Sequence, residues 1–118
     1  MVRALGDVLP DEGRILVIDD ASPDGTGRVA NALAAELPHV EVLHRPRKEG
    51  LGPAYLAGFR RALTGGADLV LAMDCDFSHD PADVPRLVAA AADADLVLGS
   101  RYVPGGHVVN WGVGRRAV

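Results

Sequence analysis

Short apolar runs alternate with longer amphipathic stretches along this sequence. The runs are rich in Val, Ile and Leu and are bounded by polar or turn residues, a pattern typical of buried β-strands. Between them, apolar residues recur every three or four positions in Ala-rich segments, as they do on one face of a helix. The pattern predicts strands at 14–19, 40–44, 68–74 and 95–100, and helices at 25–37, 52–63 and 80–93.

The residues at the ends of these segments agree with this interpretation. Pro38 follows the first predicted helix, and Gly65 with Gly66 closes the second. Asp80 is placed to cap the third helix, with Pro81 in its first turn. Strands that alternate with helices pair in parallel through crossover connections, so we expect an α/β fold layered around a mainly parallel sheet.

Polar clusters follow three of the four predicted strands. In chain order they are DDASPDG, DCDFSHD and GSRY. In parallel α/β sheets the carboxyl ends of the strands meet at one edge, and ligands bind in the crevice beyond it. The sequence therefore places the candidate site at this edge of the sheet.

Size and composition limit the possible classes of protein. A chain of 118 residues with 48% apolar and 24% charged residues fits one globular domain rather than a disordered segment. A net charge of −4 argues against a nucleic-acid-binding protein, which needs an excess of Lys and Arg. Cys75 is the single cysteine, so no internal disulfide can form. Because there is neither a run of about 20 apolar residues nor a secretory signal, we expect a soluble, untargeted chain.

Asp74 and Asp76 form the most informative polar pair, because they end an apolar strand where an unpaired carboxylate is costly. Side chains of a strand alternate between its faces, so both carboxylates can point the same way. Two hard oxygen ligands at this spacing suit Mg²⁺ or Mn²⁺, which fill their other positions with water and substrate phosphates. Ser78 can add a hydroxyl group to this set or cap the next helix. In the structural alternative, Asp74 ends the strand and Asp76 caps a turn.

Other phosphate-binding families fit the sequence less well. A haloacid-dehalogenase phosphatase and a phospho-receiver domain also place acids after apolar strands, but both need a Lys later in the chain, and Lys48 is the only one here. The segment GLGPAY has Tyr55 where a dinucleotide-binding G-x-G-x-x-G motif requires its third glycine. No P-loop pattern occurs in the sequence.

Four segments together resemble the family 2 glycosyltransferases: VIDDASPDGTG, RPRKEGLGPAYLAGFRRAL, MDCDFSHDP and LVLGSRYVPGG. Within that family they most resemble the polyprenol-phosphate mannose synthases, the dolichol-phosphate mannosyltransferase group. The resemblance extends from residue 12 to residue 118. It implies a GT-A-type (nucleotide-diphospho-sugar transferase) fold. It also implies that mannose is transferred from GDP-mannose to a polyprenyl phosphate with inversion, assisted by Mg²⁺ or Mn²⁺.

The resemblance also implies roles for individual residues. These are nucleotide-sugar binding by Ile18, Asp20, Asp74, Cys75, Asp76 and Arg101, metal binding by Asp74, Asp76 and Ser78, and catalytic roles for Asp76 and Arg101. As alternatives, Asp20 and Asp24 can form turns, and Arg101, whose guanidinium suits phosphate oxygens, can form a surface ion pair. Asp19 is expected to be structural. The basic segment 44–48 is expected to be a solvated loop, with phosphates or an anionic membrane surface as alternative partners.

The sequence departs from the family pattern at its start. The family opens with a strand and loop resembling VVPTYNE, whereas this chain begins within what matches the first helix, MVRALGDVLP. In the family's sheet that strand lies between the strands at 14–19 and 69–73. Residues 1–118 are therefore expected to form a partial GT-A domain, truncated at both ends, without the first nucleotide-binding strand and the C-terminal acceptor region. Cys75 replaces the more usual Ala, a change between small residues.

Two alternative functions stay open at this point. One is another polyprenyl-phosphate glycosyltransferase, for example one that transfers glucose from UDP-glucose. The other is a non-catalytic remnant that binds nucleotide weakly. For the mannosyltransferase, the expected partners are GDP-mannose and a polyprenyl phosphate lipid, without nucleic acid. A lipid acceptor implies peripheral contact with a membrane, and the expected location is its cytoplasmic face.

Overall fold

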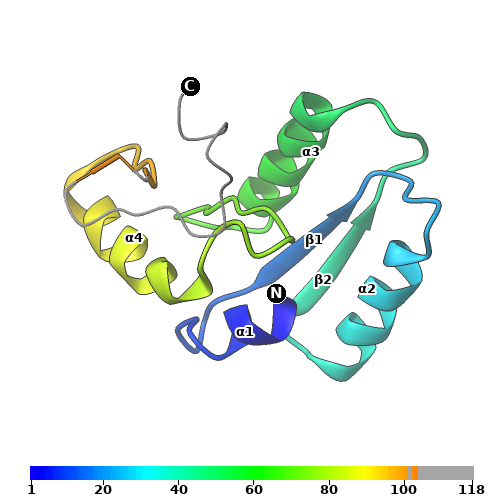
Figure 1. The fold of residues 1–118 in the computed structure, drawn as a ribbon, viewed down its shortest axis with the longest axis horizontal. Coiled ribbons are helices and arrows are strands. Elements are labelled where there is room, and N and C mark those ends of the chain that lie inside the picture. Colours follow the sequence, from blue (N-terminus) through cyan, green and yellow to red (C-terminus); the bar gives the residue numbers. More distant parts are fainter. Residues whose placement is uncertain (101, 104–118) are drawn as a thin grey trace, which may run out of the picture. The chain divides into compact units, whose positions relative to one another are not determined.

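A computed structural model describes residues 1–100, 102 and 103. The chain divides into two compact units, residues 1–85 and 86–118, each with its own internal contacts. In chain order the elements are α1 (Val2–Gly6), β1 (Ile15–Asp19), α2 (Thr26–Glu36), β2 (Val40–His44), α3 (Leu51–Thr64) and α4 (Val84–Ala90), with 3₁₀ turns at Pro81–Asp83 and Ala91–Asp93 (Figure 1). None of the helices in the described part of the chain is long and apolar enough to cross a membrane.

Strands β1 and β2 are parallel neighbours in a two-stranded sheet. Their register places Ile15 opposite Val40 and Asp19 opposite His44, so both strands end at the same edge. Helix α2 connects them, and α3 follows β2 (Figure 1). The predicted α/β class and parallel pairing are confirmed for this unit. The bounds of these two strands and two helices match the prediction to within one residue.

The core of the first unit lies where α1 and α2 pack on one face of the sheet. Val2, Ile15 and Val40 form its buried centre. Partly buried apolar residues surround them: Leu5, Leu9, Val17, Leu33, Ala34 and Leu37. Arg3 of α1 also makes a two-pronged ion pair with Glu36 of α2, with N–O distances of 2.8 and 2.6 Å. Because an exposed ion pair adds at most about 1 kcal/mol, apolar burial is the main force that holds these helices on the sheet.

Helix α3 packs on the opposite face of the sheet. Side chains of a strand alternate between faces, so Ile18 points away from the face that carries Ile15 and Val17. Its Cδ1 atom lies so close to Gly58 of α3 that a Cβ atom at residue 58 would collide with it. The sheet therefore has helices on both faces, as a layered α/β domain requires.

The strands predicted at 68–74 and 95–100 are not formed. A strand needs a neighbour whose backbone groups pair with its own. Neither segment has such a neighbour among the described residues. Most of their apolar side chains are exposed, for example Leu69 at 50% and Leu98 at 77%. The prediction was correct about the apolar pattern of these segments and wrong about their pairing.

One edge of β1 likewise has no strand partner within the described ranges. On its other edge, towards β2, the Ile15 N–H donates to the carbonyl oxygen of His39 at 2.9 Å. Alternate residues of a strand direct their backbone groups to opposite sides, so those of Leu16 and Ile18 face the unpaired edge. These groups remain available to a ligand or a further strand.

The third predicted helix, 80–93, begins as expected but is shorter. The Asp80 side chain caps it by accepting a hydrogen bond from the Ala82 N–H at 2.9 Å. Only α4 is α-helical, and a 3₁₀ turn lies on each side of it. Pro85 has no N–H to donate to the Pro81 carbonyl oxygen, as an α-helix from residue 81 requires, and this oxygen accepts from the Val84 N–H in a 3₁₀ turn.

Gly27 of α2 lies against the end of β1 so closely that a Cβ atom there would collide with the Asp19 carboxylate. We expect Gly27→Ala to lower the free energy of unfolding by about 1–3 kcal/mol, because the added methyl group overpacks this contact. Gly52→Ala in α3 is the control, since a Cβ atom there meets open space. Urea denaturation followed by circular dichroism measures both variants. Equal stability of the two would contradict the close contact at Gly27.

Candidate functional site

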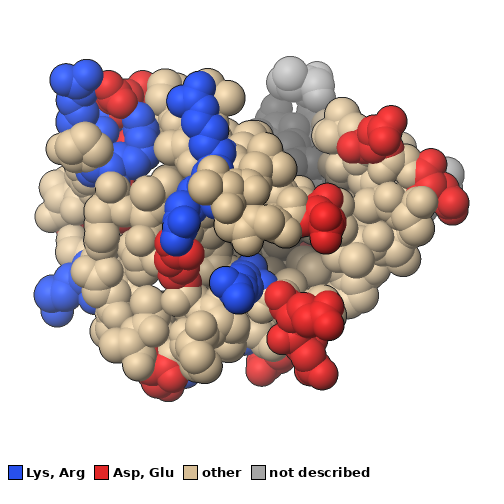
Figure 2. Space-filling view, turned by 180° about the vertical axis from the view of Figure 1, so that it is seen from behind, with Lys and Arg blue, Asp and Glu red and all other residues tan. Residues whose placement is uncertain are grey.

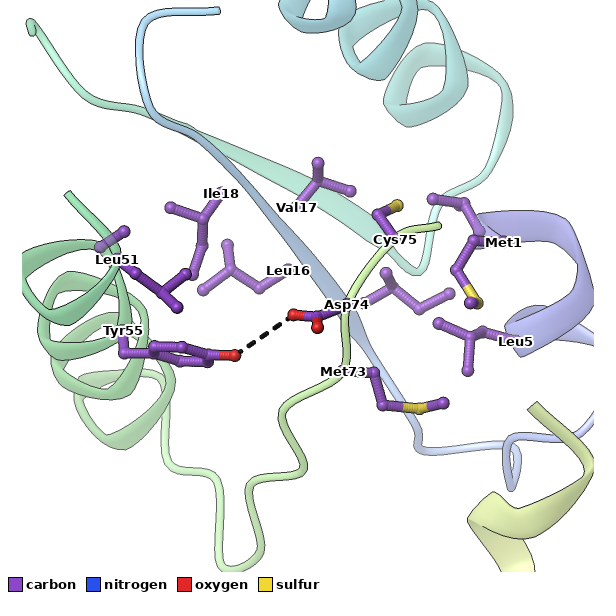
Figure 3. Close-up of a pocket in the computed structure, with 13 residues that line it drawn as sticks. Met1, Leu5, Leu16, Val17, Ile18, Leu51, Tyr55, Met73, Asp74 and Cys75 are labelled. Carbon is purple, nitrogen blue, oxygen red and sulfur yellow. Dashed lines mark hydrogen bonds between the residues drawn. The ribbon is translucent and has the colours of Figure 1, made fainter. Parts of the chain in front are cut away.

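A cavity of about 250 Å³ lies along β1 in the first unit. Its walls come from α1, β1, α3 and the segment 73–75, and most of its lining side chains are apolar (Figure 3). Ile18, Asp74 and Cys75, three residues of the predicted nucleotide-sugar set, line it together. The cavity therefore joins residues that are far apart in the sequence at the unpaired edge of β1.

Asp74 is the one carboxylate on the wall of this cavity. The Tyr55 hydroxyl of α3 points towards it and donates to its Oδ1 atom at 3.5 Å (Figure 3). The backbone N–H of Asp74 donates to His79 Nδ1 at 3.3 Å. Cys75, the next residue, carries an exposed free thiol. The long contact from Tyr55 and the exposure of Asp74 leave its carboxylate accessible to a ligand.

Asp76 and Ser78 form a tight turn. The Ser78 N–H donates to Asp76 Oδ1 at 2.9 Å, and Phe77 between them has a left-handed φ of 61°. Hydrogen bonding by Ser78 lowers the pKa of the Asp76 carboxyl group and so stabilises its ionised form. The helix cap comes from Asp80, which removes one of the two roles foreseen for Ser78.

The donor set around Asp76 suits a hard divalent cation only in part. Asp74, Asp76 and Ser78 all offer oxygen atoms and are all exposed, which agrees with Mg²⁺ or Mn²⁺ chemistry. No group of three or more His, Cys, Asp or Glu side chains in the described part of the chain could hold a metal ion by itself. These residues fit an ion that takes its remaining ligands from water and substrate phosphates.

Asp20 lies at the carboxyl end of the sheet and is paired with Arg45. The Arg45 guanidinium contacts Asp20 Oδ1 and, at 2.5 Å, Glu49 Oε2. The Arg45 side chain is only 8% exposed, which corrects the expectation of solvation for this one residue, whereas the other residues of the segment 44–48 are exposed. Arg47, at 79% exposed, agrees with that expectation. Basic and acidic side chains gather over this loop at the upper left of Figure 2. The reason for the correction is the parallel register, which brings the end of β2 beside the end of β1.

Asp19 is buried and structural, as expected. Its Oδ1 accepts the Ser22 N–H at 3.1 Å, and its Oδ2 lies 3.0 Å from His44 Nδ1. Asp24 forms a turn, because its Oδ1 accepts both the N–H and the hydroxyl of Thr26, at 3.0 and 2.7 Å. His44 was missed as a member of this edge. The signal for it was present, because a polar residue that ends one strand lies beside the polar residue that ends its parallel neighbour.

The predicted site residues are thus only partly brought together. Asp20, Asp76 and Ser78 do not line the cavity that Ile18, Asp74 and Cys75 share. Arg101 lies outside the described residues. The site roles of all seven residues stay predictions.

Sequence comparison decides the family. The model of the family described as Glycosyl transferase family 2 matches residues 2–117. The chain belongs to glycosyl transferase family 2. This confirms the resemblance found in the four motifs and the GT-A-type fold class, of which the chain covers part.

Curated family 2 relatives are longer than this chain. It is 55% identical over 114 residues to "Undecaprenyl-phosphate mannosyltransferase" of Micrococcus luteus, which covers 97% of the chain and 46% of that protein. It is 56% identical over 99 residues to "Polyprenol monophosphomannose synthase" of Mycolicibacterium smegmatis, and the match covers 82% of this chain and 37% of that protein. It is 39% identical over 105 residues to "Dolichol-phosphate mannosyltransferase" of Pyrococcus furiosus, and the match covers 88% of this chain and 29% of that protein. The chain spans less than half the length of these relatives. No solved structure matches it significantly.

The lowered pKa of Asp19 predicts a loss of stability in acid. Hydrogen bonding by Ser22, followed by that of His44, lowers this pKa from its ordinary value of 3.8. The folded state favours the carboxylate, so its stabilisation is present above 3.8 and is lost as the pH falls through the folded pKa. We expect Asp19→Asn to lower the free energy of unfolding by about 1–3 kcal/mol at neutral pH, and by less in acid. Denaturation curves across this pH range measure the difference, and a constant difference would contradict the linkage.

The burial of Arg45 predicts that two neighbouring arginines differ in importance. Arg45→Met removes the partner of Asp20 while keeping the apolar stem, and we expect it to lower the free energy of unfolding by about 2 kcal/mol. Arg47→Met is the matched control, with an expected change within about 0.5 kcal/mol because its side chain is exposed. Chemical denaturation measures both variants. A loss as large for Arg47→Met as for Arg45→Met would contradict the assigned pairing.

Proposed function

We propose that residues 1–118 form the nucleotide-sugar-binding part of an enzyme that transfers mannose from GDP-mannose to a polyprenyl phosphate lipid, with inversion. One observation carries the proposal. Asp74 lies at the β1 cavity and an ionised Asp76 follows two residues later, in a chain 55% identical to an undecaprenyl-phosphate mannosyltransferase. Within this proposal the chain is a partial GT-A domain, since it spans 46% of that relative.

The residues of the candidate site divide the binding of the donor among them. Arg45 contacts the Oδ1 atom of Asp20, so the Oδ2 atom of Asp20 can accept a hydrogen bond from the nucleotide. Backbone groups of Ile18 face the unpaired edge of β1 and can bond to the same ligand. The backbone of Cys75 and the Arg101 guanidinium are assigned to the diphosphate, which a planar guanidinium binds well.

A divalent ion, Mg²⁺ or Mn²⁺, belongs with the two carboxylates in this proposal. Asp74 and Asp76 would hold it with help from the Ser78 hydroxyl. When bound, such an ion neutralises charge on the diphosphate leaving group. Hydrogen bonding in the turn with Ser78 lowers the pKa of Asp76, which favours the charged carboxylate that this role requires.

The acceptor explains why the site needs no strong general base. A polyprenyl phosphate is already anionic at neutral pH, so its oxygen can attack the anomeric carbon without losing a proton. Rate enhancement would come from positioning the acceptor and stabilising the departing GDP, with Asp76 and Arg101 as the catalytic residues. A lipid acceptor requires at least peripheral contact with a membrane, and we place the protein at the cytoplasmic face.

Calorimetric titration tests the proposed donor site. We expect the chain to bind GDP-mannose in the presence of Mn²⁺ and to bind it more weakly without the metal ion. Asp76→Asn keeps the acceptor atom of the turn and removes the charge, so we expect affinity at least roughly tenfold lower, about 1.4 kcal/mol. Asp11→Asn is the control, an exposed acidic residue outside the site, whose affinity should match that of the unchanged chain.

The outcomes of this titration are distinct. Tighter binding of UDP-glucose than of GDP-mannose would replace the mannosyl donor by a glucosyl one. Absence of binding by a folded chain would overturn the proposal that residues 1–118 hold a donor site by themselves, and would favour the non-catalytic alternative. Equal affinities of Asp76→Asn and Asp11→Asn would remove Asp76 from the metal and diphosphate site.

A further inference from the structure

The His44 side chain joins three elements at the carboxyl end of the sheet. It belongs to the last residue of β2, and its Nδ1 lies 3.0 Å from Oδ2 of Asp19, the last residue of β1. Its Nε2 lies 2.8 Å from Oδ1 of Asn31 on α2. One imidazole ring therefore connects both strands to the helix that runs between them.

Asp19 depends on this contact because it is buried. Only 7% of its surface is exposed. A buried carboxylate is costly unless hydrogen bonds compensate for the lost water. Ser22 supplies a bond to one oxygen atom and His44 to the other. Without His44, Oδ2 of Asp19 would lose its side-chain partner.

The first turn of α2 allows little freedom around this pair. A Cβ atom at Gly27 would collide with Asp19 Oδ2 and would lie 3.1 Å from Cε1 of the His44 ring. Glycine at this position lets the helix backbone approach both side chains. The carboxylate is therefore held between the helix, the imidazole ring and the loop that follows β1.

That loop, residues 20–25, carries the candidate nucleotide ligand Asp20. Two of its residues have left-handed backbone conformations, Ala21 with φ 56° and Gly25 with φ 87°. For a residue with a Cβ atom such a conformation costs on the order of 1 kcal/mol, so surrounding contacts must hold it. The bond from the Ser22 N–H to Asp19 Oδ1 is one of these contacts. The Asp19 carboxylate thus supplies one of the contacts that hold the loop in this conformation.

We infer that His44 is a positioning residue for the nucleotide site: it fixes the Asp19 carboxylate, which in turn holds the loop that presents Asp20. The inference rests on the proposed function for the identity of the ligand. The loop geometry is independent of the proposed function, because it can be measured without ligand. Consecutive residues at the end of β2 then serve consecutive carboxylates at the end of β1, with His44 on Asp19 and Arg45 on Asp20.

Two substitutions of His44 separate its two contacts. The amide nitrogen of Asn can occupy the place of Nδ1, so His44→Asn keeps the bond to Asp19. The amide nitrogen of Gln reaches the place of Nε2, so His44→Gln keeps the contact with Asn31 and loses the one with Asp19. Hydrogen exchange of the Ser22 amide, measured by NMR, reports on the loop. Titration with GDP in the presence of Mn²⁺ reports on the site, and thermal unfolding reports on overall stability.

For His44→Asn we expect the Ser22 exchange rate and the GDP affinity to stay within about threefold of those of the unchanged chain. For His44→Gln we expect roughly tenfold faster Ser22 exchange and roughly tenfold weaker GDP binding. Unchanged Ser22 exchange in both variants would overturn the inference. The inference would also be overturned if both variants lost Ser22 protection and GDP affinity equally, in proportion to their loss of thermal stability. If the unchanged chain binds no GDP but the exchange pattern appears, the nucleotide proposal fails while the positioning of the loop by His44 stands.

Discussion

A buried carboxylate at the end of β1 is the constraint on which the polar edge of this protein depends. A buried carboxylate is costly without hydrogen-bond partners, and the two partners of Asp19 come from two different segments. Ser22 is supplied by the following loop, His44 by the neighbouring strand, and the space for both by Gly27 of α2. The requirement to satisfy one charge therefore fixes the relative positions of two strands, a helix and a loop.

Backbone pairing is satisfied on one side of β1 and not on the other. Towards β2 the ladder is regular, and both strands end in register at Asp19 and His44. On the other side, the backbone groups of Leu16 and Ile18 border an apolar cavity whose far wall is the segment 73–75. The apolar run before Asp74 has the composition of a strand, but it pairs with no described strand.

The same edge accounts for how the proposed nucleotide-sugar site can be assembled from weak local signals. Asp-x-Asp pairs, acidic turns and basic loops are each common in proteins. Here Ile18, Asp74 and Cys75 lie around the cavity beside β1. Arg45 pairs with Asp20, the residue that directly follows β1. Family membership gives these residues a shared chemical context, and the proposed donor site follows from both together.

The sequence alone determined two strands and two helices of the first unit and the family, and it indicated the candidate site residues. Apolar periodicity located β1, β2, α2 and α3, because strand and helix periods depend on neighbours along the chain. The motif that contains Asp74 and Asp76 and the three other motifs indicated the family, because each motif is a pattern of neighbouring residues along the chain. Only the tertiary structure decided which carboxylates are paired. The partners of Asp19 and Asp20 are His44 and Arg45, 25 residues further along the chain, and they meet through the parallel register rather than through sequence proximity. Pairing of the segment at 68–74 likewise depends on which backbone lies beside it, which its own composition cannot specify.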